Sequence, residues 1–202
     1  MKPKKQPTMI EAAERGQNLF YGIGCKKSYK KAFPWLMEAA QAGHVHAQNL
    51  VGCCLEQGWG TEQDFTEAVV WFRQAASHNH PEAIFNLALS YEHGTGVEVN
   101  LTEAFQLYQR AAALGDAPSM CNLGVCYWEG IGTEPNPVEA VRWSRKAARR
   151  SDARAQFNLG VAYLEGAGVK QNLRFANLWL TKAALQGHKQ ALQLLEKCRK
   201  PE

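Results

Sequence analysis

Residues 152–187 read DARAQFNLGVAYLEGAGVKQNLRFANLWLTKAALQG, and most of the chain repeats this stretch with a period of 36 residues. A glycine pair of the form Gly-x-Gly begins at residues 22, 58, 94, 130 and 166. An alanine stands ten residues after the first glycine of each pair, and an Ala-Ala doublet begins seven residues later. A period that five copies keep without an insertion is typical of a repeat protein.

Each period predicts two helices. Asp64, Asn100 and Asn136 each stand three residues before a glutamate, which is the pattern of a capping box at a helix start. The first glycine of each pair is suited to end the preceding helix, because glycine adopts the left-handed conformation without a steric penalty. We predict first helices at 8–21, 45–57, 81–93, 117–129 and 153–165, second helices at 29–42, 65–78, 101–114, 137–150 and 173–186, and a closing helix at 189–199.

The expected architecture is therefore all-α, a right-handed α/α solenoid of 36-residue helix-turn-helix repeats, counted as one array. A disordered tail is expected at residues 1–7, and a C-terminal capping helix with its tail at 188–202. The expected repeats are 8–43, 44–79, 80–115, 116–151 and 152–187.

Composition and charge restrict the class of protein. The net charge of +4 conceals a segregation: residues 56–139 carry twelve acidic and two basic side chains, whereas residues 140–202 carry thirteen basic and four acidic ones. The chain contains no apolar run long enough to span a membrane, and its basic start leads into no signal-like apolar stretch. The six cysteines are placed so that none can bridge the two helices of one repeat, so reduced thiols and a cytoplasmic location are expected.

The recurring residues of the last full repeat resemble the Sel1-like repeat (SLR) family, a branch of the tetratricopeptide-like helical repeats. The resemblance rests on Ala155, Leu159-Gly160, Tyr163, Gly166-x-Gly168-Val169, Asn172, Ala176, Trp179, Ala183-Ala184 and Gly187. It spans about residues 8–199 and implies a non-catalytic scaffold or adaptor for protein–protein interactions.

Function in such an array is expected at positions that differ between repeats, because the recurring positions pack the repeats together. If first helices line a concave face, that face carries an apolar groove for a partner peptide. Its predicted residues are Phe85, Asn86, Leu89, Asn122, Val125, Trp128, Phe157, Asn158 and Val161. Two alternatives stay open: the apolar side chains could pack between first helices, and the three asparagines could tie those helices together.

Basic residues suggest a second function. Arg142, Arg145, Lys146, Arg149, Arg150 and Arg154 form a patch that could bind an anionic partner or surface. The patch lacks the aromatic residues and motifs of nucleic-acid binders, so a protein partner is preferred, and the chain is expected to be a monomer or to self-associate weakly through its opposite charges.

No enzyme, cofactor or metal ion is predicted. The chain lacks nucleophile and metal-protease signatures. Two histidine pairs, His44-Val-His46 and His78-Asn-His80, resemble metal ligands, and helix pairing could bring His44 and His80 together. The sequence shows no carboxylate or cysteine that completes a ligand set, so histidines at helix starts are the preferred interpretation.

Overall fold

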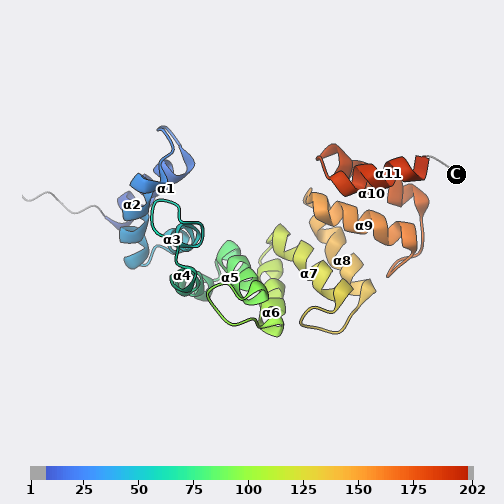
Figure 1. Ribbon diagram of the computed structural model, residues 1–202, viewed down its shortest axis with the longest axis horizontal. Helices are drawn as coiled ribbons and strands as arrows, with labels where there is room; N and C mark the ends of the chain where they lie inside the picture. Colours follow the sequence, from blue (N-terminus) through green and yellow to red (C-terminus); the bar gives the residue numbers. More distant parts are fainter. Residues whose placement is uncertain (1–7, 200–202) are drawn as a thin grey trace, which may run out of the picture. The chain divides into compact units, whose positions relative to one another are not determined.

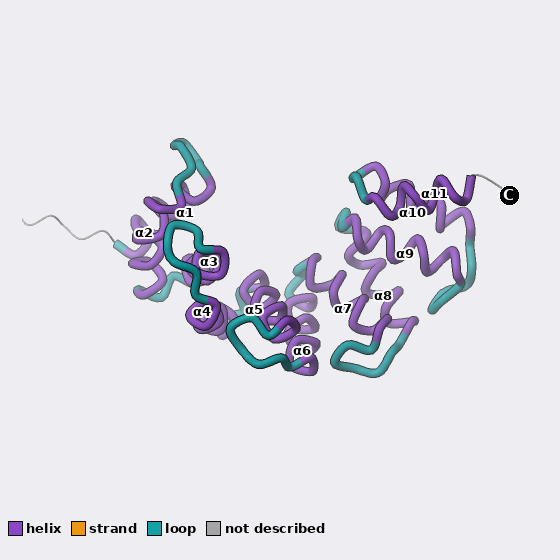
Figure 2. Tube along the Cα trace, in the orientation of Figure 1, coloured by secondary structure: helices purple, strands orange, loops and turns teal. Residues whose placement is uncertain are grey.

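The computed structural model describes residues 8–199, with side chains through residue 197, and these residues form α-helices and no strand (Figures 1 and 2). The first helices are α1 (Met9–Tyr21), α3 (Val45–Gln57), α5 (Pro81–His93), α7 (Ala117–Glu129) and α9 (Ala153–Glu165). The second helices are α2 (Tyr29–Gln41), α4 (Phe65–Ser77), α6 (Leu101–Ala113), α8 (Pro137–Arg149) and α10 (Leu173–Leu185), and α11 (Lys189–Arg199) closes the chain. Every boundary lies within one residue of its prediction. The tails expected at residues 1–7 and 200–202 lie outside the described residues.

The helices belong to two compact units, Met1–Asn100 with α1–α5 and Leu101–Glu202 with α6–α11. Within each unit every helix packs against the next one in the chain, and the first helices α1 and α3, like α7 and α9, also contact each other. Each unit is thus a stack of successive helices, with α5 last in the first unit and α6 first in the second.

Caps explain why the helix boundaries could be predicted. The side chains of His44, His80, Asp116 and Asp152 each accept the backbone N–H three residues ahead, at the N-termini of four first helices. Gly22, Gly58, Gly94, Gly130 and Gly166 end the first helices with φ between 67° and 79°.

Two of the predicted capping boxes, at Asp64 and Asn136, form only in part. Asp64 and Asn136 accept the N–H of the glutamate three residues on. The glutamates, however, turn to other partners: Glu67 accepts a hydrogen bond from Trp71, and Glu139 pairs with Arg142 at 3.1 Å. Ser28, at the position expected to cap α2, makes no side-chain cap. A complete box forms at Thr8 and Glu11.

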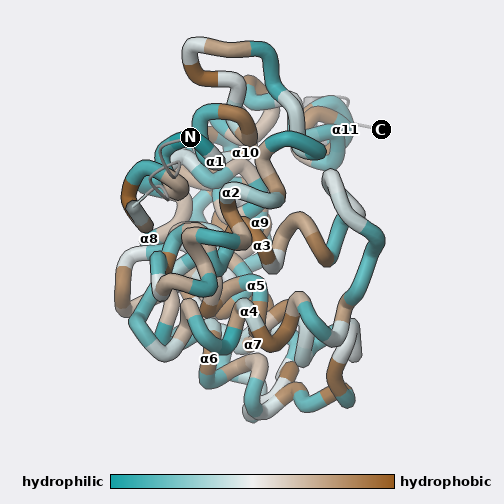
Figure 3. The backbone as a smooth tube through the Cα atoms, turned by 90° about the vertical axis from the view of Figure 1, so that its left-hand side faces the viewer, coloured by the Kyte–Doolittle hydropathy of each residue, from teal (hydrophilic) through white to brown (hydrophobic). Residues whose placement is uncertain are grey.

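In three of the repeats the core places a small residue opposite a large one. Gly16, Gly52 and Gly160 on first helices face Leu36, Phe72 and Leu180 on second helices, and a Cβ atom added at any of these glycines would overlap the facing side chain. The three large side chains are at most 2% exposed. Figure 3 shows apolar and polar residues alternating along the backbone.

Ser151 occupies a left-handed position, with φ 65°, in the turn after α8. The same register holds Gly43, Gly115 and Gly187 in other repeats, all with positive φ. An L-residue is strained there by roughly 1–2 kcal/mol. Glycine would relieve this strain, but part of the stabilisation is lost because glycine has more conformational entropy in the unfolded chain. Ser151→Gly is therefore expected to raise the free energy of unfolding by about 0.5–1 kcal/mol, measured by urea denaturation. Ser151→Ala is the control and should not stabilise; equal gains from both variants would contradict the argument.

None of the helices within residues 8–199 is long and apolar enough to cross a membrane.

Candidate functional site

One repeat departs from the small-opposite-large rule. The register of Leu36, Phe72, Tyr108 and Leu180 holds Ser144 in the fourth repeat. Ser144 lies on α8 opposite Gly124 on α7, so both sides of the helix pair are small. A pocket of about 210 Å³ opens at this place.

The pocket is bounded by three helices of the second unit. Its lining residues are Gly124, Val125, Trp128 and Glu129 from α7, Val141 and Ser144 from α8, and Phe157, Asn158, Val161 and Ala162 from α9. Most of this lining is apolar, and Trp128 is 37% exposed at the rim.

The volume of the pocket limits the size of the ligand that it could hold. An apolar cavity of about 150 Å³ holds a benzene molecule, whereas pockets for drug-sized ligands start at about 300 Å³. The pocket therefore suits one aromatic or branched aliphatic side chain better than a whole cofactor.

The structure gathers part of the predicted groove and leaves the rest elsewhere. Val125, Trp128, Phe157, Asn158 and Val161 all line the pocket. Of the other four predicted positions, Phe85, Asn86 and Leu89 lie on α5 in the first unit, and Asn122 lies on α7 without lining the pocket; each of the four is half-buried. The sequence analysis does not select Ser144, although the 36-residue register carries the signal.

Phe157 also packs within the second unit. Its ring stacks on His188 with the centroids 4.6 Å apart, and it touches the buried cluster of Leu180, Ala183, Ala191 and Leu195. One edge of the pocket is thus held rigidly, while Trp128 forms the exposed edge.

The three asparagines differ in their partners. Asn86 donates to Asn49 Oδ1 at 3.1 Å and so ties α5 to α3. Asn122 accepts from Arg154 at 2.7 Å and so ties α7 to α9. Among residues 8–197, whose side chains are described, no hydrogen bond joins the Asn158 side chain to another residue. Its amide is available at the pocket.

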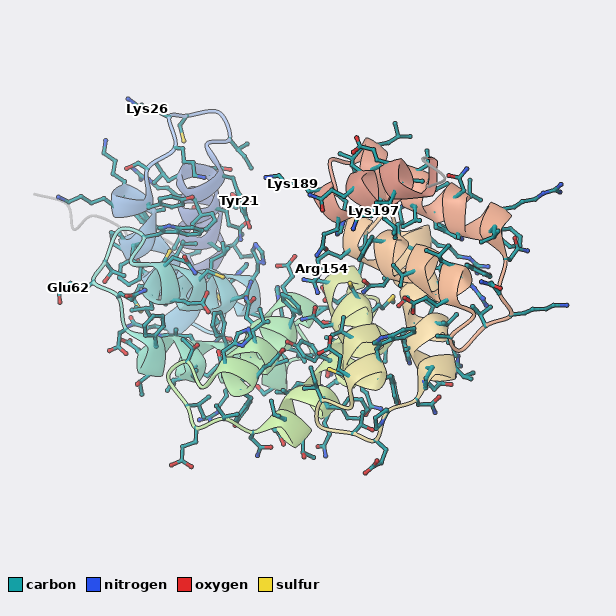
Figure 4. The ribbon with its side chains drawn as sticks, turned by 45° about the vertical axis from the view of Figure 1, so that its right-hand side comes forward. Tyr21, Lys26, Glu62, Arg154, Lys189 and Lys197 are labelled. Carbon is teal, nitrogen blue, oxygen red and sulfur yellow. The ribbon has the colours of Figure 1, made fainter. Side chains whose placement is uncertain are left out.

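The basic patch is largely engaged in contacts of its own unit. Arg142 pairs with Glu139, Arg145 donates to Tyr163 Oη at 3.1 Å, and Lys146 lies 3.7 Å from the centroid of the Trp143 ring. Arg150 donates to the carbonyl oxygen of Gly115, and Arg149 lies beside it. Arg154 (labelled in Figure 4) belongs to α9 and not to α8.

Three of the cysteines are poor nucleophiles. Cys25, Cys53, Cys54, Cys121 and Cys126 are free. Burial raises the pKa of the Cys53, Cys54 and Cys121 thiols to about 12. These thiols are protonated at neutral pH, and the thiolate is the reactive form.

Residues that could hold a metal ion lie in the first unit. His46, not His44, meets His80, with 3.1 Å between His46 Nδ1 and His80 Nε2. Glu82 completes a group of three ligand atoms within 4.8 Å of one another. The sequence argument that no carboxylate joins these histidines is therefore wrong, because the start of α5 brings Glu82 beside α3.

Both the sequence and the structure of the chain are similar to those of known repeat proteins. A family model described as Sel1 repeat matches residues 11–44, 45–80, 81–116, 117–152 and 153–188. The crystal structure of a Sel1 repeat protein from Oxalobacter formigenes is similar with a TM-score of 0.88 and 30% identity, over 99% of this chain and 80% of that one. No curated protein matches the chain.

Two further structures extend the comparison. A protective antigen present in uropathogenic Escherichia coli strains, displaying an SLR fold, has a TM-score of 0.84 and 30% identity over 91% of this chain. This chain covers 39% of that antigen. Cysteine rich protein B of Helicobacter pylori, at 23% identity and a TM-score of 0.52 over 65% of this chain and 95% of that one, shows the fold alone. With the helices described above, these matches confirm the predicted class, an all-α helical-repeat solenoid.

Proposed function

The chain belongs to the Sel1 repeat family, whose members are generally non-enzymatic scaffolds for protein interactions, and from this premise we propose that it binds a partner peptide through the pocket between α7 and α9. The peptide places one large apolar side chain on Ser144 and Gly124. The observation that carries the proposal is the pairing of two small residues where other repeats place a large side chain.

The surroundings of the pocket favour a particular peptide. Trp128 and Phe157 offer aromatic faces, which concentrate binding energy at interfaces. The Asn158 amide can pair with the backbone of the peptide. Arg154 stands at the start of α9, and residues 140–202 are strongly basic. We therefore expect an apolar anchor with acidic neighbours.

A selected peptide library tests the proposal, since the natural partner need not be identified first. Peptides displayed on phage are selected on the purified chain, and their affinity is measured by calorimetry. The selected sequences should share one Trp, Phe or Leu, and Trp128→Ala should weaken binding by about 10-fold or more.

Ser144→Leu is the sharper variant, because it gives the fourth repeat the Gly–Leu pair of the first and fifth repeats. It should abolish peptide binding while raising the free energy of unfolding by about 0.5–2 kcal/mol, as filled cavities do. Leu185→Ala, which alters a side chain 82% exposed on α10, is the control and should bind normally. Peptides that bind Ser144→Leu as well as the unaltered chain would refute the proposal.

The alternative is an anionic partner held by the basic patch. Its signature is selection of purely acidic peptides whose binding is lost at about 0.5 M salt, since exposed charges are screened at that ionic strength. Binding through the pocket should persist. The internal contacts of Arg142, Arg145 and Arg150 support the pocket over the patch.

The remaining expectations stay predictions. A non-catalytic role agrees with the family and with the protonated thiols of Cys53, Cys54 and Cys121. A cytoplasmic location, a protein rather than a nucleic-acid partner, and a monomeric or weakly associating chain are part of the same proposal.

A further inference from the structure

Three consecutive first helices of the first unit are joined by a chain of polar side chains. Tyr21 at the end of α1 (labelled in Figure 4) lies 3.4 Å from His46 Nε2, through its Oη, and His46 Nδ1 lies 3.1 Å from His80 Nε2. Glu82 stands two residues after His80, and one of its oxygens accepts from Asn49 Nδ2 at 3.4 Å. Both histidines are half-buried and Glu82 is exposed.

A hydrogen bond from the backbone determines which ring nitrogens of His80 and His46 carry a proton. His80 Nδ1 accepts the N–H of Ala83 at 3.3 Å, so the proton of neutral His80 is on Nε2. That proton points at His46 Nδ1, which must then be the acceptor. The proton of His46 is consequently on Nε2, beside the Tyr21 hydroxyl. A single proton therefore lies between the two nitrogens, and the three possible ligand atoms of His46, His80 and Glu82 lie within 4.8 Å of one another.

We propose that His46 Nδ1, His80 Nε2 and the Glu82 carboxylate bind a divalent transition-metal ion, with Zn²⁺ the best match. Two imidazoles and one carboxylate suit Zn²⁺, which takes nitrogen and oxygen ligands in tetrahedral sites. The fourth position is left to water.

The distances fit such an ion. Nitrogen ligands lie about 2.0–2.1 Å from Zn²⁺, so two of them at a tetrahedral angle are roughly 3.3 Å apart, close to the 3.1 Å between His46 and His80. The carboxylate of Glu82 must approach further, and an exposed side chain can turn to do so. Tyr21 Oη remains beside His46 Nε2–H and holds the ring in the orientation that the metal needs.

Binding also requires a change of tautomer at His80. The metal replaces the proton on His80 Nε2, and that proton moves to Nδ1, so that His80 stays neutral and no proton is released. Nδ1 then no longer accepts from Ala83, and the cap bond of 3.3 Å is given up. Imidazoles bind a metal ion in the uncharged form, and burial lowers the pKa of both histidines.

The ligand set does not recur along the chain. The register of His46 and Glu82 holds Pro118, Arg154 and Gln190 in later repeats, and the register of His80 holds Asp116 and Asp152 in the fourth and fifth. Packing of the repeats therefore does not demand these three residues together. The site lies in the first unit and the peptide pocket in the second, so the two proposals stand or fall separately.

Calorimetry with Zn²⁺ alone tests the site, using the full chain without a histidine tag, freed of metal with a chelator. One equivalent should bind, and Zn²⁺ should raise Tm. His46→Ala should weaken binding by about 100-fold or more, and the nearly isosteric Glu82→Gln by about 10-fold. Co²⁺ should give visible absorption bands that His46→Ala removes.

His93→Ala is the matched control, because it deletes an exposed histidine on the same helix as Glu82, and it should leave Zn²⁺ affinity unchanged. Circular dichroism without metal checks that each variant folds, and Glu82→Gln alters only an exposed side chain. The proposal is overturned if no stoichiometric binding occurs, or if His93→Ala weakens binding as much as His46→Ala. It is also overturned if both ligand variants bind normally.

Discussion

Phe72→Ala is expected to lower the free energy of unfolding by about 3–5 kcal/mol, the usual cost of deleting a buried aromatic ring. Phe72 on α4 is fully buried, and its ring lies directly against Gly52 on α3. Alanine would leave small residues on both sides of the helix pair, as Gly124 and Ser144 do in the fourth repeat. Neighbouring helices could close only part of this cavity, so the lost contacts would not be recovered.

Urea denaturation followed by circular dichroism measures the effect. Phe65→Ala is the matched control: it removes the same ring from the same helix, but Phe65 is 39% exposed, so the expected loss is below about 1 kcal/mol. Because repeats can unfold separately, hydrogen exchange should show whether the loss is concentrated in α3 and α4. Similar losses for both phenylalanines would mean that the small-opposite-large pairing does not organise the core.

Gly168→Ala is expected to cost about 2–5 kcal/mol. An L-residue at φ 67° is strained by roughly 1–2 kcal/mol. The new Cβ would also overlap the carbonyl oxygen of Pro137, the first residue of α8 in the preceding repeat. Relief requires the backbone to shift, at about 1–3 kcal/mol.

Gly24→Ala separates these two contributions. Gly24 is the equivalent glycine of the first repeat, with φ 68°, but no atom lies within 4 Å of the position a Cβ would take. Its substitution should therefore cost only the conformational part, roughly 1–2 kcal/mol. A thermal melt of the two variants gives the difference; equal losses would show that contact between repeats plays no part.

After the first repeat, the second glycine of each pair has a larger role than the sequence indicates. The sequence pattern implies only that it shapes the turn between two helices of one repeat. In the structure, Gly60, Gly132 and Gly168 also let the turn approach the start of the second helix in the preceding repeat. Such an approach joins residues 31 positions apart, and local propensity carries no information about it.

The residues of the candidate pocket also differ in whether the sequence could select them. Trp128, Phe157 and Val161 can be selected from sequence because they differ between repeats at one register. Phe85 and Leu89 satisfy the same rule, yet they lie in another unit, since the rule does not say which neighbours each position meets. The rule does not select Ser144, because a serine at this register indicates a pocket only when the residue facing it is known to be glycine.

By itself, the sequence determined the helices, their ends and the repeat, because caps, left-handed glycines and a fixed period act over a few residues. Only the tertiary structure decided which side chains meet. It placed Ser144 against Gly124 to open a pocket, and His46 beside His80 and Glu82 to form a candidate ligand set. These contacts depend on how one helix lies on the next, and that arrangement is set by the packing of whole side chains and not by any local pattern.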